Sequence, residues 1–142
     1  MGSVLAHAAQ VKPRMELRME RKTTQRQAIC QAFVDSDQPM SPAEVLASAK
    51  RKVSGIGIAT VYRAIKSLLD EEWLTTVEIP GQPPRYEQFG KPHHHHFLCS
   101  KCGKMFEVDG CPKNLATLVP QGFRLERHEI LLYGKCATCA IR

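Results

Sequence analysis

Four cysteines occur as two pairs with the same internal spacing, and this pattern predicts a metal site. Cys99 and Cys102 form one Cys-x-x-Cys pair, and Cys136 and Cys139 form the other. Two intervening residues let both thiolates of a pair face one ion, and two pairs complete the four-sulfur tetrahedron typical of structural zinc. A thioredoxin-like redox motif is the alternative, but one pair would suffice for it. We therefore expect a structural zinc ion whose loss unfolds the C-terminal part of the chain.

Four consecutive histidines, His93 to His96, lead directly into the first cysteine pair. If this segment is a strand, alternate side chains share a face, so His94 and His96 point one way and His93 and His95 the other. One short strand can then supply two imidazoles to each of two metal sites on opposite faces. The alternative is a row of exposed histidines on an edge strand.

Helix signals precede this metal-binding segment. Thr23 or Thr24 is expected to cap a first helix that ends near residues 35–37. Ser41 is expected to cap a second helix that runs to about residue 52. Pro42 fits the first turn of that helix, and Glu44 closes a capping box.

A third helix is expected over residues 58–72, after the break at Gly55-Ile56-Gly57. Its apolar stripe consists of Val61, Ile65, Leu68 and Leu69. Two short strands, residues 74–79 and 85–89, flank a turn rich in proline and glycine. Three helices followed by a hairpin is the order of a winged helix, a variant of the helix-turn-helix that binds DNA.

The remaining sequence predicts a second lobe. Strands are expected at residues 93–98, 104–108 and 123–133, with a short helix at 112–118. The predicted organisation is a flexible extension over 1–20, a winged-helix DNA-binding domain over 21–84, a hinge over 85–92 and a metal-binding domain over 93–142. Lobes this small bury little apolar surface, so a metal ion or a dimer interface is expected to stabilise them.

The net charge of +6 is confined to one half of the chain. Residues 1–66 hold 11 Lys and Arg against 5 Asp and Glu, whereas residues 67–142 hold 9 of each. This asymmetry suits a polyanionic partner such as DNA once a fold can enter a groove. No run of 18 apolar residues and no signal-peptide pattern is found, so we expect a cytoplasmic protein.

The third helix is the expected reading head for DNA. Its side chains off the apolar stripe, which can face a major groove, are Thr60, Tyr62, Arg63 and Lys66. Arginine can make paired hydrogen bonds to guanine, and tyrosine or threonine can touch thymine methyl groups. The basic side chains expected at phosphates are Lys22, Arg26 and Lys52. Packing of Tyr62 against the hairpin is the alternative for that residue.

Several motifs together resemble the ferric uptake regulator family, over about residues 20–140. They are Ala59-Thr60-Val61-Tyr62-Arg63, Tyr86-Glu87, the histidine-rich strand leading to Cys99, Cys102, Gly103 and Lys104, and His128 through Leu132-Tyr133-Gly134 to Cys136. The resemblance implies a homodimer with an α+β fold, in which a winged-helix domain precedes a small α/β dimerisation domain. It implies that metal binding arranges the two winged helices for a pseudo-palindromic DNA operator, usually to repress metal-uptake or stress genes.

The resemblance also implies two sites besides the zinc. The matching positions of the sensing site are Glu87, His94, His96 and Glu107. Those of the second site are His93, His95 and His128, with an acidic residue expected near Asn114. Imidazole and carboxylate ligands suit Fe²⁺ or Zn²⁺, with Mn²⁺ and Ni²⁺ as alternatives.

Two departures from the family pattern affect these sites. Pro39-Met40 stands where the family commonly supplies a sensing-site histidine, just before the second helix. This change weakens the link between metal and reading head, and it argues against peroxide sensing by oxidation of that histidine. At the second site, Asn114 replaces the acid and His95 stands where an aspartate is frequent, so its occupancy stays open.

Other functions remain as alternatives. A metalloenzyme would use the histidines with Glu87 or Glu107 as general base, yet no hydrolase motif accompanies them. One alternative is a zinc-stabilised interaction module. Another is a metal-independent or thiol-responsive regulator of the same fold. Both would keep the cysteines but would lack regulation by a sensing metal. Cys30 is expected to be a buried small hydrophobe. Cys111 is expected to be structural, with a redox role or a substitute ligand as the alternative.

Overall fold

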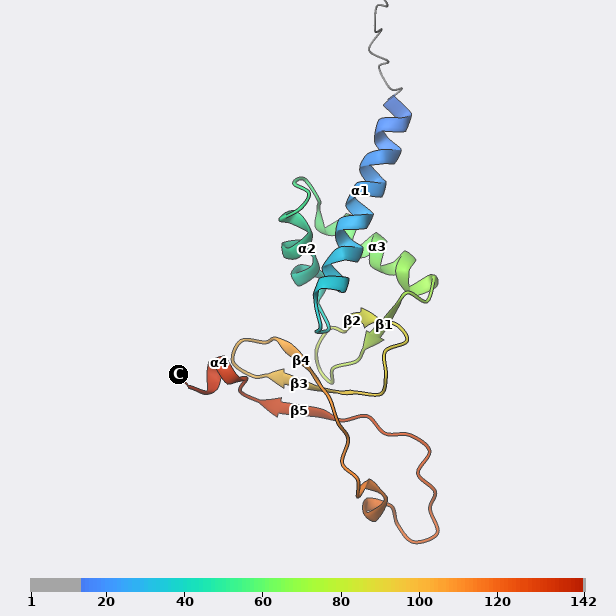
Figure 1. Cartoon of the computed structure of the whole chain (residues 1–142), viewed down its shortest axis with the longest axis vertical. Helices are drawn as coiled ribbons and strands as arrows, with labels where there is room; N and C mark the ends of the chain where they lie inside the picture. Colours follow the sequence, from blue (N-terminus) through green and yellow to red (C-terminus); the bar gives the residue numbers. More distant parts are fainter. Residues whose placement is uncertain (1–13, 142) are drawn as a thin grey trace, which may run out of the picture.

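The computed structural model describes the backbone of residues 14–141 and the side chains from residue 21 onward. Its N-terminal lobe contains α1 (Arg14–Asp35), α2 (Pro42–Lys50), α3 (Ile58–Asp70), β1 (Leu74–Val77) and β2 (Arg85–Gln88). β1 and β2 form an antiparallel hairpin. The three helices lie above this hairpin in Figure 1, so the lobe is a winged helix.

The winged helix has one apolar core beneath its helices. Val45 of α2 and Val61 of α3 are fully buried, and Ile29 of α1 packs in the same cluster. The three buried residues of α3 are Val61, Ile65 and Leu68, which confirms the predicted stripe. Ser41 and Glu44 form the predicted capping box at the start of α2.

A second, smaller lobe follows the hairpin. It contains β3 (His95–Cys99), β4 (Met105–Val108), the short 3-10 helix η1 (Leu115–Leu118), β5 (Leu131–Gly134) and α4 (Ala137–Ala140). The strand order is β4-β3-β5, with β4 antiparallel and β5 parallel to β3. β3 therefore lies in the centre of the sheet, and both of its neighbours can position residues around its histidines.

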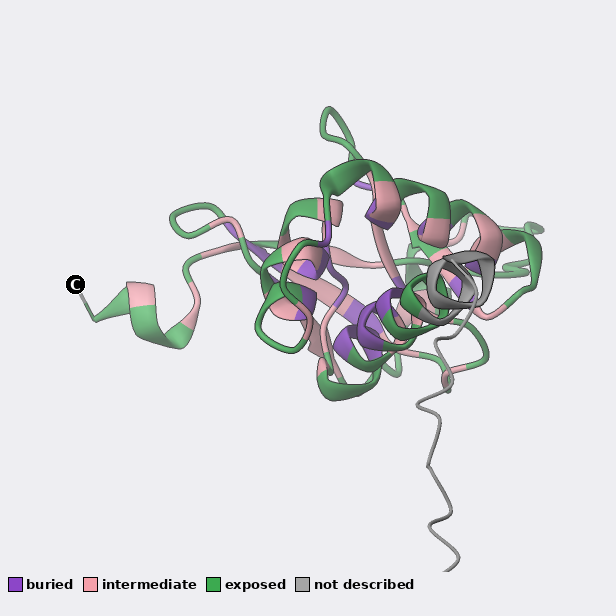
Figure 2. Ribbon diagram, turned by 90° about the horizontal axis from the view of Figure 1, so that it is seen from above, coloured by how far each residue is buried: buried purple, intermediate pink, exposed green. Residues whose placement is uncertain are grey.

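The second lobe has very little interior of its own. Its apolar cluster consists of Leu98 and Met105 together with Ile79, which follows β1 of the winged helix. None of the residues from 106 to 141, all within the described range, is buried. In Figure 2 the buried colour is concentrated in the helical lobe and is absent from the C-terminal end. The folded state of this lobe therefore requires stabilisation beyond that of its own apolar core.

Several predicted elements differ from the structure. β3 begins at His95, so His93 and His94 precede the strand that was expected over residues 93–98. α1 begins at Arg14, so the cap predicted at Thr23 or Thr24 was wrong. Of the extension expected over residues 1–20, residues 1–13 lie outside the described residues and residues 14–20 belong to α1. The last strand begins at Leu131 and not at residue 123. The Ile130 carbonyl still accepts a hydrogen bond from the His96 amide of β3, but residues 123–129 belong to no strand of the described sheet. The helix expected over 112–118 is a 3-10 turn.

The lobe boundary also shifts from its expected position. β2 runs from Arg85 to Gln88 and pairs with β1 along its whole length. The expected hinge over 85–92 therefore contains the second strand of the wing, and we propose that the winged-helix lobe ends at Gln88. Within the described part of the chain, no helix is long and apolar enough to cross a bilayer.

Candidate metal centres and DNA-facing surface

The two cysteine pairs come together at one end of the central strand. Cys99 ends β3, Cys102 follows in the turn to β4, and Cys136 and Cys139 lie at the start of α4 and within it. The four sulfurs lie within 4.8 Å of one another. The Cys102 and Cys136 Sγ atoms are 3.9 Å apart. Zinc–sulfur bonds of about 2.3 Å place the sulfurs of a tetrahedral site about 3.8 Å apart, so the cluster has the dimensions that zinc requires.

Backbone amides favour the thiolate form of Cys99. The N–H groups of Cys102 and Cys136 donate to its Sγ at 3.5 and 3.3 Å. These hydrogen bonds lower the pKa of Cys99 to about 5. The hydrogen bond that the Cys139 thiol donates to Cys136, together with burial, raises the pKa of Cys139 to about 12. Four thiolates cannot share this space without a cation, and a divalent ion would compensate their charge.

Gly103 lets the chain turn sharply behind Cys102. Its φ is +73°, in the region where a side chain would be strained. Its N–H donates to the Cys99 carbonyl at 2.9 Å, which closes the turn. The chain thus makes a tight turn directly after the first cysteine pair.

A second cluster forms between the wing and the central strand. Glu87 is in β2, whereas His94 precedes β3 and His96 is in it. The Nε2 atoms of the two histidines are 3.1 Å apart, and both lie 3.0–3.2 Å from carboxylate oxygens of Glu87. Ligands on a tetrahedral ion with bonds of about 2.0–2.1 Å would be about 3.3 Å apart. A metal ion here would bond to both lobes at once.

The hydrogen bonding of His94 prepares its Nε2 for a metal. Its Nδ1 donates to the Pro92 carbonyl at 2.8 Å, because a carbonyl can only accept. In the neutral ring, Nε2 then carries a lone pair that points toward Glu87. Metal-binding histidines commonly fix their other nitrogen in this way. Without a cation, that lone pair would face carboxylate oxygens, which is unfavourable.

When metal is absent, protonation of the histidines can partly replace the positive charge of a metal ion beside Glu87. Burial alone would lower the pKa of His94, but the Pro92 carbonyl and the charges of Glu87 and Glu107 raise it overall. Burial would raise the pKa of Glu87, but the hydrogen bond and charge of His96 and the charge of His94 lower it overall. These shifts favour the protonated form of His94 beside a charged Glu87, so protons compete with a metal for this cluster.

Metal binding at this cluster is expected to weaken as the pH falls. Because the pKa of His94 is raised above its usual value, protonation competes with metal at neutral to acidic pH. Below that pKa the affinity should fall about tenfold per pH unit for one displaced proton. Calorimetric titration of the zinc-containing protein with Mn²⁺ between pH 6 and 8 measures this slope. Equal affinities across the range would contradict proton competition, and His94→Ala should flatten the slope.

Glu107, the fourth ligand expected from the family pattern, lies beside the cluster and not within it. Its carboxylate pairs with Lys91 Nζ at 2.9 Å. Its Oε1 lies 3.9 Å from Nδ1 of His94, on the side of the ring away from the cluster. In this structure the cluster consists of three residues, and Glu107 would have to leave Lys91 in order to bind the same ion.

The opposite face of the central strand carries the other two histidines. His93 and His95 gather with His128 and Cys111, with ligand atoms within 4.8 Å of one another. His93 and His128 face each other with their Nε2 atoms 3.1 Å apart. The predicted alternation of the four histidines between two faces is thus present. Asn114 is not in the cluster, and Cys111 stands near the place where an acid was expected.

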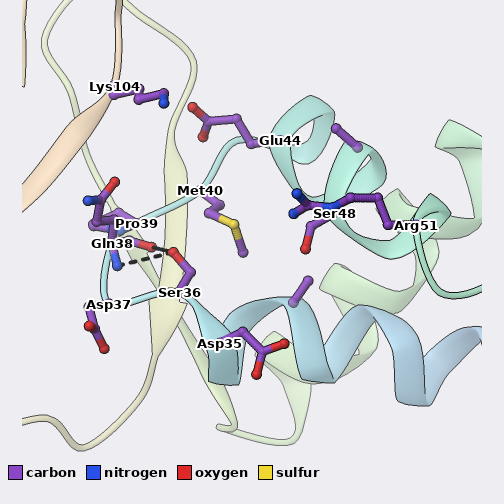
Figure 3. A pocket seen from close by; sticks show the side chains of 12 residues that line it. Asp35, Ser36, Asp37, Gln38, Pro39, Met40, Glu44, Ser48, Arg51 and Lys104 are labelled. Carbon is purple, nitrogen blue, oxygen red and sulfur yellow. Dashed lines mark hydrogen bonds between the residues drawn. The ribbon is translucent and has the colours of Figure 1, made fainter. Parts of the chain in front are cut away.

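The loop before α2 supplies no ligand atom to these clusters. Pro39 and Met40 are buried, and the Met40 backbone pairs with Tyr86 in a β-bridge. Figure 3 shows this loop bordering a cavity of about 680 Å³ that Glu44, Arg51 and Lys104 also line. The loop still touches the strand that carries Glu87. Glu87 lies in β2 of the hairpin, so a metal held by Glu87, His94 and His96 would still have a ligand in the N-terminal lobe without the missing histidine.

Arg85 makes a second connection between the lobes. From β2 it donates a hydrogen bond to the Gly103 carbonyl, which lies in the turn of the four-cysteine cluster. Its Nη1 lies 3.5 Å from Glu44 at the start of α2. The largely buried guanidinium of Arg85 thus connects three parts of the chain: the turn at Gly103, the wing and the start of α2. No motif signalled this contact, since it depends on how the lobes are packed.

The third helix presents its polar side chains to solvent. Tyr62 is 56% exposed, and Arg63 and Lys66 are also exposed. Thr60 is half-buried and accepts a hydrogen bond from Arg63 at 3.3 Å. Thr60 and Arg63 also line a cavity of about 270 Å³ between α1 and α3, together with the exposed Lys22. Lys22 of α1 and two of the α3 residues therefore lie around the same cavity.

Two of the basic residues expected at phosphates are already paired. Arg26 binds Glu71 at 2.6–2.8 Å and Ser67 at 3.0 Å. Lys52 pairs with Asp35 at 2.9 Å. In this structure both side chains tie helices or helix ends together, and a phosphate would have to compete with the carboxylates. Lys22 remains the best placed of the three.

Comparison with known proteins gives consistent matches along the chain. A model of the ferric uptake regulator family matches residues 18–133. The ferric uptake regulation protein of Campylobacter jejuni is 32% identical over 122 residues, which cover 82% of this chain and 78% of that protein.

Solved structures agree with this match. The structure of the Helicobacter pylori ferric uptake regulator, described as having three functional metal binding sites, has a TM-score of 0.64 at 26% identity and covers 89% of this chain and 90% of its own. A zinc-bound manganese uptake regulator has a TM-score of 0.70 at 28% identity and covers 86% of this chain and 97% of its own. The similarity extends over both lobes.

Proposed function

The chain belongs to the ferric uptake regulator family of metal-responsive transcription regulators, and from this we propose that it represses transcription by binding a pseudo-palindromic operator as a homodimer. As a member of this family it is a regulator and not an enzyme. The observation that carries the proposal is the Glu87–His94–His96 cluster, which joins the wing to the second lobe. A metal ion there would fix the orientation of the reading heads.

We assign one role to each of the three clusters. The four cysteines hold structural zinc, as the dimensions of their cluster allow. Glu87, His94 and His96 form the sensing site for Fe²⁺, Zn²⁺ or a neighbouring metal of the same series, with Glu107 beside it. His93, His95 and His128 belong to a second site on the opposite face. The manganese and iron regulators among the relatives support no single choice of sensing metal.

The homodimer is supported by the surface of the second lobe. Large apolar side chains are exposed there, namely Leu118, Phe123, Leu125, Leu132, Tyr133 and Ile141. Exposed apolar side chains gathered in one lobe commonly mark a protein interface. A partner chain would also supply strand pairing to residues 123–129.

Sedimentation velocity is expected to give the mass of two chains. Tyr133→Asp places a charge in the proposed interface and should raise the dissociation constant at least about tenfold. Val34→Asp is the matched control, because Val34 is similarly exposed but lies on α1. A monomeric wild-type protein, or equal effects of the two substitutions, would contradict the proposed interface.

DNA reading is assigned to α3. Arg63→Ala is expected to reduce affinity for the operator by about 1–3 kcal/mol and to relax preference at one base pair. Tyr62→Ala should also weaken binding, whereas Lys22→Ala should mainly reduce the salt dependence. The operator can be obtained by selecting duplexes from a random pool with the metal-loaded protein, and fluorescence anisotropy then gives each affinity.

Lys113→Ala is the control for this series, since Lys113 is exposed but lies in the second lobe. Every variant should retain its zinc and its helical circular dichroism. If Arg63→Ala and Tyr62→Ala bound the operator as tightly as Lys113→Ala, α3 would not be the reading head.

A further inference from the structure

Cys111 lies against the histidine cluster on the far face of the central strand. Its Sγ is 2.9 Å from Nε2 of His128, and that nitrogen is itself 3.1 Å from Nε2 of His93. Three potential ligand atoms from three separate segments thus converge on one point. Cys111 is exposed and belongs to neither cysteine pair, so the four-sulfur cluster does not account for it.

Protons alone satisfy this arrangement poorly. The Nε2 atom of His128 faces a sulfur and another imidazole nitrogen, and it can make only one hydrogen bond as a donor or as an acceptor. In a tetrahedral zinc site, nitrogens lie about 3.3 Å from one another and about 3.6 Å from a sulfur. The nitrogen–nitrogen separation is close to this value, whereas the sulfur–nitrogen separation of 2.9 Å is clearly shorter, so the Cys111 side chain would move away from His128 on binding. A cation at the centre would replace competing protons by bonds to every ligand.

His95 is the weakest member of the cluster. It is 3% exposed, and its Nε2 has no hydrogen-bond partner among the described residues. Its Nδ1 accepts a hydrogen bond from the Ile130 amide at 3.2 Å, so the neutral ring carries its proton on Nε2. His95 can act as a ligand only if that amide contact opens. The core of the cluster is therefore His93, Cys111 and His128.

We propose that Cys111 is a thiolate ligand of the second metal site, which makes it a sulfur–nitrogen site for zinc or a similarly thiophilic divalent cation. The inference deepens the proposed function, because it assigns a ligand and a metal class to the site that His93, His95 and His128 form. Binding of the divalent ion forms a metal–sulfur bond and releases the thiol proton to solvent, with no change of oxidation state.

The ligand types separate this site chemically from the sensing site. Thiolate favours zinc over hard cations, whereas the carboxylate and imidazoles of the sensing cluster also accept manganese and iron. The two faces of one strand would therefore differ in metal preference. At a concentration at which Mn²⁺ or Fe²⁺ fills only the sensing site, the same concentration of Zn²⁺ should fill the Cys111 site.

Cobalt reports on this site selectively. Full-length protein with zinc retained in the four-cysteine cluster is titrated with Co²⁺ under reducing conditions. The sensing cluster contains no sulfur, so a thiolate-to-cobalt charge-transfer band in the near ultraviolet can arise only from Cys111, provided no zinc is released. The native protein should show the band, and excess Zn²⁺ should remove it.

Cys111→Ser should abolish the band and weaken zinc binding at this site about tenfold or more. Cys30→Ala is the matched control, since Cys30 lies in the winged helix, and it should retain the band. As a second measurement, bound zinc should slow alkylation of Cys111 in the native protein, read by peptide mass spectrometry. Absence of the band from native protein, its persistence in Cys111→Ser, or alkylation unaffected by zinc would each overturn the proposal. None of these measurements uses DNA, so they can fail while the regulatory function stands.

Discussion

Removing zinc from the four-cysteine cluster is expected to unfold the second lobe while the winged helix stays folded. The lobe has almost no apolar core, with only Leu98 and Met105 buried beside Ile79 of the preceding lobe. Structural zinc supplies on the order of 10 kcal/mol of folding free energy in small zinc-dependent domains at neutral pH. The winged helix, by contrast, has a full core between its three helices.

Hydrogen–deuterium exchange of Cys136→Ser tests this expectation. Amides of β3 and β4 should exchange as in an unfolded chain, whereas those of α1 to α3 should remain protected. Cys30→Ala removes a cysteine without removing a zinc ligand and should leave both lobes protected. Protection of β3 and β4 in zinc-free Cys136→Ser would show that the lobe folds without the ion.

Replacing both histidines of the sensing cluster is expected to abolish the metal response of DNA binding. His94→Ala/His96→Ala leaves Glu87 as the sole member of the cluster, so the ion that joins β2 to β3 is lost. Couplings between ligand sites are typically 1–3 kcal/mol, so a 5- to 150-fold effect of metal on operator affinity should disappear. The structural zinc should survive, and metal analysis of the purified variant checks this.

His93→Ala/His128→Ala provides the matched control. These histidines lie on the other face, and every member of their cluster comes after residue 92. A metal there bonds only to the second lobe and has no ligand in the winged helix. The control variant should therefore keep its metal response, and equal losses in the two variants would remove the distinction between the sites.

The cysteine cluster and the two histidine faces could be predicted from local spacing, whereas Glu87 and His128 came only from the family resemblance. The two cysteine pairs and the alternation of His93 to His96 depend on geometry within a few residues, which sequence specifies directly. The capping box of Ser41 and Glu44 is local in the same way. Such features do not depend on how the lobes are arranged.

Features that depend on distant contacts could not be predicted. Cys111 reaches His128 only because β5 returns beside β3, and the pairing of Arg26 with Glu71 depends on how α1 crosses α3. The strand predicted over residues 123–133 is present only from Leu131, and residues 123–129 belong to no strand of the described sheet. A sequence pattern indicates that a segment can form a strand, but whether it does so depends on a pairing partner that the pattern does not contain.

A metal that bridges the wing and the second lobe is expected to control the affinity for DNA. The most direct measurement is the operator affinity of wild-type protein that holds only its structural zinc, measured by fluorescence anisotropy as the free concentration of Mn²⁺, Fe²⁺ or Zn²⁺ is raised. We expect affinity to rise at least about fivefold as the Glu87–His94–His96 cluster fills. An affinity that stays constant while metal analysis shows this cluster occupied would contradict the account.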